Sequence, residues 1–203
     1  MALEQPDPGV LRKAQARDEH AFSLIVRAYE TPVFNYVLRV VGDRSLAEDL
    51  TQEVFLRVFQ GLGSYSGRSL FTTWLFQVTK NRVLDELRAI ERRPRKAVQL
   101  EAAPELEAVE LPIERAETVD ALWRALGRMP VDLKLALLLR DIVGLSYNEI
   151  AEVLEVTLTT VKWRIFKARE DVQAALAREG ITSGSSLAVN PGGYVEASAV
   201  GDA

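Results

Sequence analysis

Apolar residues recur at spacings of three and four along two long blocks of the chain, residues 10–92 and 116–179. This spacing places them on one face of a helix, whereas the strict alternation typical of strands is scarce. We therefore expect an all-α protein with two small helical domains joined by a flexible linker. The predicted helices span residues 18–41, 45–61, 70–91, 118–128, 131–141, 146–154 and 158–178.

The segment between the blocks, residues 93–115, differs sharply in composition. It contains Pro94, Pro104 and Pro112, which oppose a continuous helix. From residue 101 to 117 there are six glutamates and one arginine. Such a segment is typical of a solvated, extended tether; a second interpretation is that its negative charge mimics nucleic acid in a channel. Residues 180–203, rich in Ser and Gly, predict a disordered tail.

Several classes of protein are excluded or disfavoured by composition. The chain has no cysteine and a single histidine, His20, so we expect no metal site and no cofactor. No phosphate-binding glycine loop and no nucleophile–base set is present, which argues against an enzyme. The N-terminus does not resemble a secretory signal and no apolar run is long enough for a membrane span, so we expect a cytoplasmic protein. The net charge of −4 disfavours a free-standing DNA binder.

The C-terminal block carries the strongest motif. A short helix from Ser146, with Glu149 completing a capping box, is followed after a tight turn by a second helix from Leu158. Two short helices joined in this way predict a helix-turn-helix, whose second helix enters the DNA major groove. We expect the inward-facing residues to be Ile150, Ala151 and Leu154 in the first helix, and Val161, Ile165 and Ala168 in the second.

Residues 158–169 contain four basic residues and no acidic one. Positive charge is thus concentrated on the helix that would meet phosphate. The alternative is an ordinary solvated helix face. The basic residues are Lys162, Arg164, Lys167 and Arg169.

In the N-terminal block, the helix over 45–61 has two distinct faces. Its apolar stripe predicts a buried side, and we expect a Ser45–Glu48 capping box to begin the helix, with Asp43 as a rival cap. Pro32 is expected to kink or divide the preceding helix, which Gly42 ends. The stripe comprises Leu46, Leu50, Val54 and Val58 with Phe55 and Phe59; the other face carries Asp49, Gln52, Glu53 and Leu56, and could be solvated or a partner surface.

A glycine- and serine-containing loop, residues 64–69, leads into a helix whose end is basic, with a net charge of +4 from residue 80 to 96. A basic helix beside an aromatic loop suits single-stranded nucleic acid. Phe71 and Trp74 have the spacing of core residues, which leaves Tyr65 as the better candidate for base contact.

Residues 144–169 resemble region 4.2 of extracytoplasmic-function sigma factors through Gly144-Leu145-Ser146, Glu149-Ile150-Ala151, Leu154, Thr160-Val161-Lys162, Arg164 and Lys167-Ala168-Arg169. The resemblance implies a C-terminal domain, 116–179, that reads the −35 promoter element. Trp163 and Thr159 depart from the serine and glycine common at their positions. The implied contacts are Thr159, Thr160, Lys162, Trp163, Arg164 and Lys167.

Residues 47–59, 62–75 and 79–88 resemble regions 2.2, 2.3 and 2.4 of the same family. The resemblance implies an N-terminal domain, 10–92, that docks on the clamp helices of the largest polymerase subunit and recognises and melts the −10 element. It also implies an anti-sigma factor as a partner. A free-standing helix-turn-helix regulator is the alternative. The implied polymerase contacts are Asp49, Gln52, Glu53 and Leu56; the −10 contacts are Ser64, Tyr65, Ser66, Gly67 and Arg68 in the loop and Lys80, Asn81, Arg82 and Arg88 on the helix.

Overall fold

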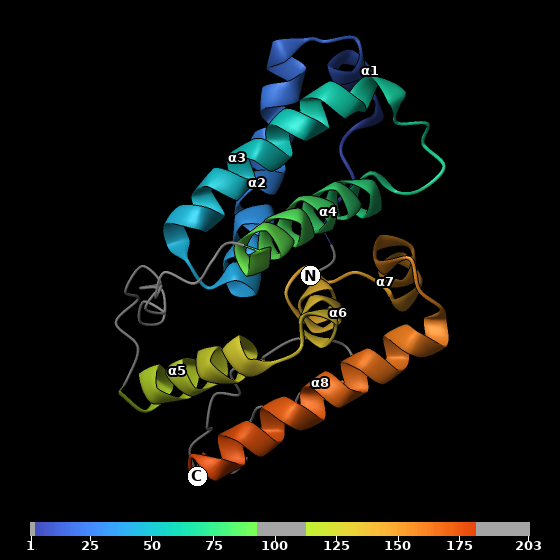
Figure 1. Ribbon diagram of the computed structural model, residues 1–203. Coiled ribbons are helices and arrows are strands. Elements are labelled where there is room, and N and C mark those ends of the chain that lie inside the picture. Colours follow the sequence, from blue (N-terminus) through green and yellow to red (C-terminus); the bar gives the residue numbers. More distant parts are fainter. Residues whose placement is uncertain (1–2, 93–112, 182–203) are drawn as a thin grey trace, which may run out of the picture.

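The computed structural model describes residues 3–92 and 113–181, the side chains of 113–117 excepted, and these parts of the chain are all-α (Figure 1). The predicted fold class is confirmed. The predicted tail and nearly all of the predicted linker lie outside the described residues. The helices are α1 (Pro8–Gln15), α2 (Glu19–Val41), α3 (Arg44–Gly61), α4 (Phe71–Arg92), α5 (Ile113–Arg128), α6 (Val131–Asp141), α7 (Tyr147–Leu154) and α8 (Leu158–Arg178), with a 3₁₀ turn at Leu62–Ser64.

Helices α2, α3 and α4 pack around the core of the N-terminal half. The stripe expected on α3 is the buried one, since Leu50, Val54 and Val58 are fully enclosed. Tyr36 of α2 meets Phe76 of α4 edge-to-face, with ring centroids 5.5 Å apart. Burial of such aliphatic and aromatic side chains is the main favourable term in folding, and it fixes the positions of the exposed faces of α3 and α4.

Helix α2 runs without division through Pro32. A kink or a division was expected at Pro32, and the division does not occur. Proline removes one hydrogen bond and clashes with the preceding turn, but Tyr29, Val33 and Tyr36 on either side are buried in the core. Tertiary burial therefore outweighs the local cost of the proline.

The beginnings and ends of the helices follow side-chain caps. Asp43 accepts a hydrogen bond from the Leu46 amide at 2.8 Å, so Asp43 caps α3 in preference to the Ser45–Glu48 box. Gly42 ends α2 with φ of 76°, in the left-handed region that favours glycine. Helix α1, capped by Asp7, was not expected from periodicity because it spans little more than two turns.

The C-terminal half consists of α5 to α8. Helix α8 packs along α5, α6 and α7, and Val161, Ile165 and Ala168 are buried as expected. On α7 the fully buried residues are Ile150 and Val153, whereas Ala151 and Leu154 are only partly buried. Helix α5 begins five residues earlier than expected, at Ile113.

The two halves lie against each other (Figure 1), with α4 in contact with α7, and α2 in contact with α6 and α5. Buried apolar residues of both halves form one continuous cluster. The helices of the two halves share an interface that includes α4, the helix predicted to meet the −10 element.

The cap of α3 can be tested by mutation. Asp43→Ala removes the acceptor for the Leu46 amide, and we expect it to lower the free energy of unfolding by about 1 kcal/mol. Ser45→Ala is the matched control, since Ser45 is exposed and should change stability by less than about 0.5 kcal/mol. Urea unfolding of the full chain measures both. Equal losses would instead identify Ser45 as the cap.

Candidate nucleic-acid and partner interfaces

Helices α7 and α8 form the predicted helix-turn-helix. Ser146 begins α7 through a full capping box with Glu149: the Glu149 amide donates to Ser146 Oγ at 3.3 Å, and Glu149 Oε2 accepts from the Ser146 amide at 2.8 Å. Helix α7 ends at Glu155 in the left-handed conformation, with φ of 57°. Thr157 then caps α8 by accepting from the Thr160 amide at 3.2 Å. These caps hold the turn that sets the direction of the second helix.

The first turns of α8 present an exposed surface. Lys162 and Thr159 are exposed, as are Trp163 (59% exposed) and Phe166 (69% exposed). Thr160 is half-buried, and its hydroxyl lies 2.8 Å from that of Thr157. Large apolar side chains with this exposure contribute nothing to the core and are therefore available to a ligand.

Three basic residues of α8 are held by acidic residues of the same half. Arg164 pairs with Asp132 of α6 at 3.0 Å, and Arg169 with Asp141 at 2.6 Å. Lys167 contacts Glu170 and Asp171, and hydrogen bonding, first to Glu170, raises the pKa of its amine. Among the basic residues between 158 and 169, Lys162 has the most freedom to meet a phosphate.

Helix α4 carries the residues expected to contact the −10 element, but they do not share one face. Asn81 and Arg88 are exposed, and Arg88 lies 3.7 Å from Asp85. Lys80 is buried, with its amine 3.1 Å from Glu155 of the other half. The set expected from the sequence is therefore dispersed around the helix.

Arg82 lies in the interface between α3 and α4. Its guanidinium donates to Glu53 of α3 and, at 2.8 Å, to Glu86 of its own helix. Hydrogen bonding to Glu53 raises the pKa of Arg82 and lowers that of the Glu53 carboxyl. Only 8% of Arg82 is exposed, so its position supports a bridge between helices better than a DNA contact.

The loop before α4 turns its aromatic residue inward. Tyr65 packs against Trp74 and Phe71, with centroids 5.2 and 5.9 Å away, and its hydroxyl donates to the Ser69 carbonyl at 2.6 Å. Ser64 donates to the Gly61 carbonyl. The residues that this loop leaves exposed are Ser64, Ser66, Gly67 (φ of 73°) and Arg68.

The polar face expected on α3 is exposed. Asp49, Gln52 and Glu53 are exposed, and Leu56 is 61% exposed. Gln52 and Leu56 also line a groove of about 880 Å³ between α2 and α3, which contains aromatic residues of both helices. An exposed leucine beside an aromatic groove, edged by charged groups, has the composition of a protein-binding surface.

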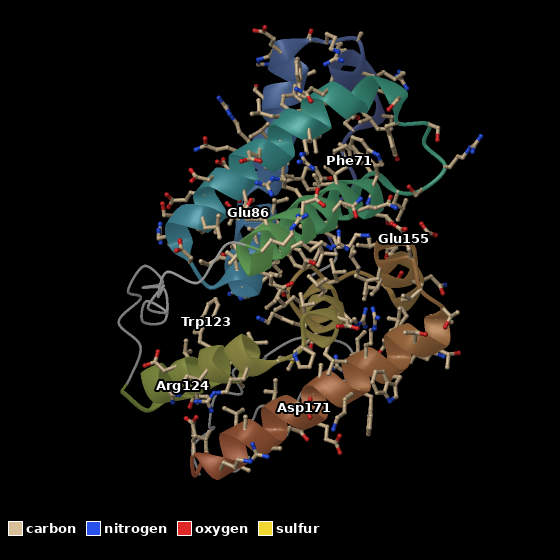
Figure 2. The ribbon with its side chains drawn as sticks, in the orientation of Figure 1. Phe71, Glu86, Trp123, Arg124, Glu155 and Asp171 are labelled. Atoms are coloured by element: carbon tan, nitrogen blue, oxygen red, sulfur yellow. The ribbon has the colours of Figure 1, made fainter. Side chains whose placement is uncertain are left out.

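Sequence reasoning missed the residues that join the two halves. Glu155 accepts from Lys80 and, at 3.3 Å, from Gln77 Nε2; Figure 2 places Glu155 between α4 and α7. Lys134 of α6 is buried and donates to the Val40 carbonyl at the end of α2. One feature of the sequence could have indicated this contact. Glu155 follows α7 directly, at a position where a helix commonly ends in glycine.

The part of the chain that is described shows neither a metal-binding cluster nor a membrane-spanning helix. Residues 3–92 and 113–181 contain no group of three His, Cys, Asp or Glu residues placed to hold a metal ion. No helix among them is long and apolar enough to cross a bilayer.

Two solved structures have a similar fold. CnrH in complex with the cytosolic domain of CnrY superimposes with a TM-score of 0.66 at 21% identity, over 86% of this chain and 99% of that one. The sigma factor RpoE in complex with the anti-sigma factor NepR from Bartonella quintana gives a TM-score of 0.67 at 21% identity, over 77% of this chain and 96% of that one.

Sequence comparison identifies the family. Residues 25–93 match the model of sigma-70 region 2, and residues 120–172 match that of sigma-70, region 4. The RNA polymerase sigma-H factor of Pseudomonas aeruginosa is 33% identical, covering 87% of this chain and 96% of the relative. The ECF RNA polymerase sigma-E factor of Escherichia coli K12 is 32% identical, covering 85% and 95%. The chain therefore belongs to the extracytoplasmic-function group of the sigma-70 family, and it is an alternative sigma factor.

Proposed function

We propose that this alternative sigma factor binds core RNA polymerase through the exposed face of α3 and recognises its promoters through α4 and α8. The observation that carries the proposal is that two exposed surfaces, one around Leu56 and one around Lys162 and Trp163, occur on separate halves of one chain. Neither surface is needed for the core. Together they suit a protein that joins a polymerase to two promoter elements.

The α3 face offers a leucine, an aromatic groove and carboxylates. Apolar anchors surrounded by polar groups carry most of the affinity of protein interfaces, and Asp49 and Glu53 would meet basic groups of a partner. The implied partner is the pair of clamp helices of the largest polymerase subunit. Because Glu53 already holds Arg82, we assign more of the interaction to Asp49, Gln52 and Leu56.

The N-terminal turns of α8 would enter the major groove at the −35 element. Recognition helices use these turns for base edges. Lys162 would contact a phosphate or a guanine, and Trp163 has an exposed ring that suits a thymine methyl or a sugar. Thr159 and Thr160 lie at the helix start, where amides and hydroxyls position the backbone of DNA.

For the −10 element, the exposed residues of α4 and its loop are the candidates that we retain. The exposed members of the predicted set are Ser64, Ser66, Gly67, Arg68, Asn81 and Arg88. Single-stranded DNA is bound by combining basic groups with stacking surfaces. Lys80 would contribute only after Glu155 has moved away, and Arg82 would act by fixing α4 against α3.

The remaining assignments follow from the family. We propose that the protein is not an enzyme, acts in the cytoplasm with polymerase, and has an anti-sigma factor as a partner; the fold similarity to RpoE bound to NepR supports that partner.

The alternative function, a free-standing helix-turn-helix regulator, is disfavoured by the family membership. Core-dependent promoter binding distinguishes the two: a gel shift of promoter DNA should require core enzyme, and tight binding by the chain alone would contradict the proposal.

The polymerase surface can be tested at Leu56. Leu56→Ala should lower affinity for core enzyme by about tenfold, as expected for a central apolar anchor, while stability changes little because the side chain is exposed. Leu24→Ala, an exposed leucine on α2 outside the groove, is the control and should leave affinity unchanged. Fluorescence anisotropy with labelled protein measures both. Equal affinities for the two variants would place the polymerase site elsewhere.

The −35 surface can be tested by comparing two lysines. Lys162→Ala should lower transcription from a −35-dependent promoter by about tenfold, the order expected for one base or phosphate contact. Lys167→Ala should have a smaller effect, because Glu170 and Asp171 already hold that amine. In vitro transcription with core enzyme provides the rates, and core affinity provides the control. A larger loss from Lys167→Ala would reverse the assignment.

A further inference from the structure

We propose that residues 3–17, called here the N-terminal segment, position the loop 64–69 so that its exposed residues can meet the −10 element. The segment binds the chain on both sides of that loop. It precedes residues 25–93, which match sigma-70 region 2. This positioning role rests on the proposed function, because it assumes that the loop meets promoter DNA.

The loop makes few contacts of its own that could fix its shape. Residues 65–70 form no helix, and Ser66, Gly67 and Arg68 are exposed. Within the loop, the Tyr65 hydroxyl donates to the Ser69 carbonyl at 2.6 Å. Ordering a loop costs conformational entropy for each residue that is fixed. Contacts from outside the loop therefore decide how well its backbone is held.

Gln15, the last residue of α1, holds the start of the loop. Helix α1 lies beside the 3₁₀ turn from which the loop begins (Figure 1). The Gln15 Nε2 amide donates to the Tyr65 carbonyl at 2.9 Å and to the Leu62 carbonyl at 3.4 Å. A glutamine amide carries two N–H donors, so one side chain can serve both carbonyls. Gln15 thus fixes the backbone where the chain leaves the 3₁₀ turn.

Arg17 holds the end of α3, just before the same turn. Its guanidinium donates to the Phe59 carbonyl at 2.7 Å and the Gln60 carbonyl at 3.2 Å, and it lies 4.9 Å from the centre of the Phe59 ring. The last carbonyls of a helix have no partner within it. Arg17 has φ of 70°, which is unfavourable for a residue with a side chain. These three contacts offset that cost and join α3 to the N-terminal segment.

Gln5 holds the other side of the loop, at the first turn of α4. Its Oε1 accepts from the Thr72 amide at 3.4 Å, and its Nε2 donates to Thr72 Oγ1 at 2.8 Å. The first amides of a helix also have no partner within it, so Gln5 supplies a cap for α4 from a distant part of the chain. The neighbouring Glu4 carbonyl accepts from the Tyr29 hydroxyl. Burial raises the pKa of Tyr29 to about 12, so this hydroxyl stays a donor at neutral pH.

Aromatic contacts connect the same anchor to the inside of the loop. The Tyr29 ring lies 5.3 Å from that of Phe71, and Phe71 lies 5.9 Å from Tyr65. The loop is therefore fixed before its first residue, after its last, and at its buried tyrosine. Its exposed residues project between these points. A loop that is ordered in advance loses less entropy when it binds, so the N-terminal segment should favour capture of DNA.

The test uses the full chain and three substitutions. Gln15→Met and Gln5→Met each remove an amide while nearly keeping the length of the side chain, at the two ends of the loop. Gln173→Met is the matched control, because it makes the same chemical change at an exposed residue of α8. Circular dichroism verifies that each variant is helical.

Hydrogen–deuterium exchange of the free chain measures how firmly the loop is held. In Gln15→Met the amides of residues 65–70 should exchange about fivefold faster, the order expected from the net loss of one hydrogen bond. Gln5→Met should raise exchange at the same loop and at the first turn of α4. Amides in the middle of α2 and α3 should exchange at the parent rate in every variant.

Promoter melting measures the consequence for function. The DNA is a promoter selected from a randomised library by the parent chain with core enzyme, with 2-aminopurine placed in its −10 element. Both variants of the N-terminal segment should slow the step from closed to open complex about fivefold, in proportion to the loss of loop order. Affinity for core enzyme and the dissociation constant of the closed complex should stay unchanged, which a general loss of stability would not produce.

The outcomes separate the positioning role from the proposed function. Unchanged loop exchange in both variants, or faster exchange with an unchanged rate of melting, would overturn the positioning role. Faster exchange spread evenly over α2 and α3, or an equal effect of Gln173→Met, would do the same. Failure of the parent chain to form an open complex with core enzyme would overturn the proposed function, and exchange in the free chain would still report whether the segment orders the loop.

Discussion

The packing of α4 determines how the residues proposed to meet the −10 element are presented. One side of this helix is buried against α2 and α3 through residues such as Leu75, Phe76 and Val83. Because a helix has a fixed angular relation among its residues, burial of that side also decides where Lys80, Asn81 and Arg82 lie. Arg82 is consequently directed at α3, Lys80 at α7, and Asn81 at solvent. Three neighbouring polar residues of this helix thus lie in three different electrostatic environments.

Local patterns in the sequence predicted the local structure well. The stripe through Leu50 and Val54, the glycine end of α2 and the capping box at Ser146 depend on residues within one or two turns of each other, and all three are confirmed. The division expected at Pro32 does not occur, because the cost of the proline is local while the compensating burial is tertiary. Helix α1 was missed because so short a segment carries little periodic signal.

The contacts of the candidate site were harder to predict, because they also depend on how distant helices pack together. Spacing placed Asp49, Gln52 and Leu56 on one exposed face of α3, as found. Spacing could not show that Arg82 would meet Glu53 across two helices, or that Lys80 would meet Glu155, 75 positions away. Ion pairs between distant elements depend on which helices pack together, and the charge pattern of a single helix does not contain that information.

The charges of α8 explain how a recognition helix can exist in a protein with a net charge of −4. Asp132, Asp141 and two acids of α8 itself hold three of its four basic residues between 158 and 169. Each such pair must be exchanged for a phosphate before it adds to DNA affinity, so the net gain per contact is small. The same neutralisation occurs at Lys80 in the other half. On the proposed function, each surface alone would bind DNA weakly. Affinity for a promoter would then depend on the polymerase placing both surfaces on DNA together, because linked weak contacts gain from a high effective concentration.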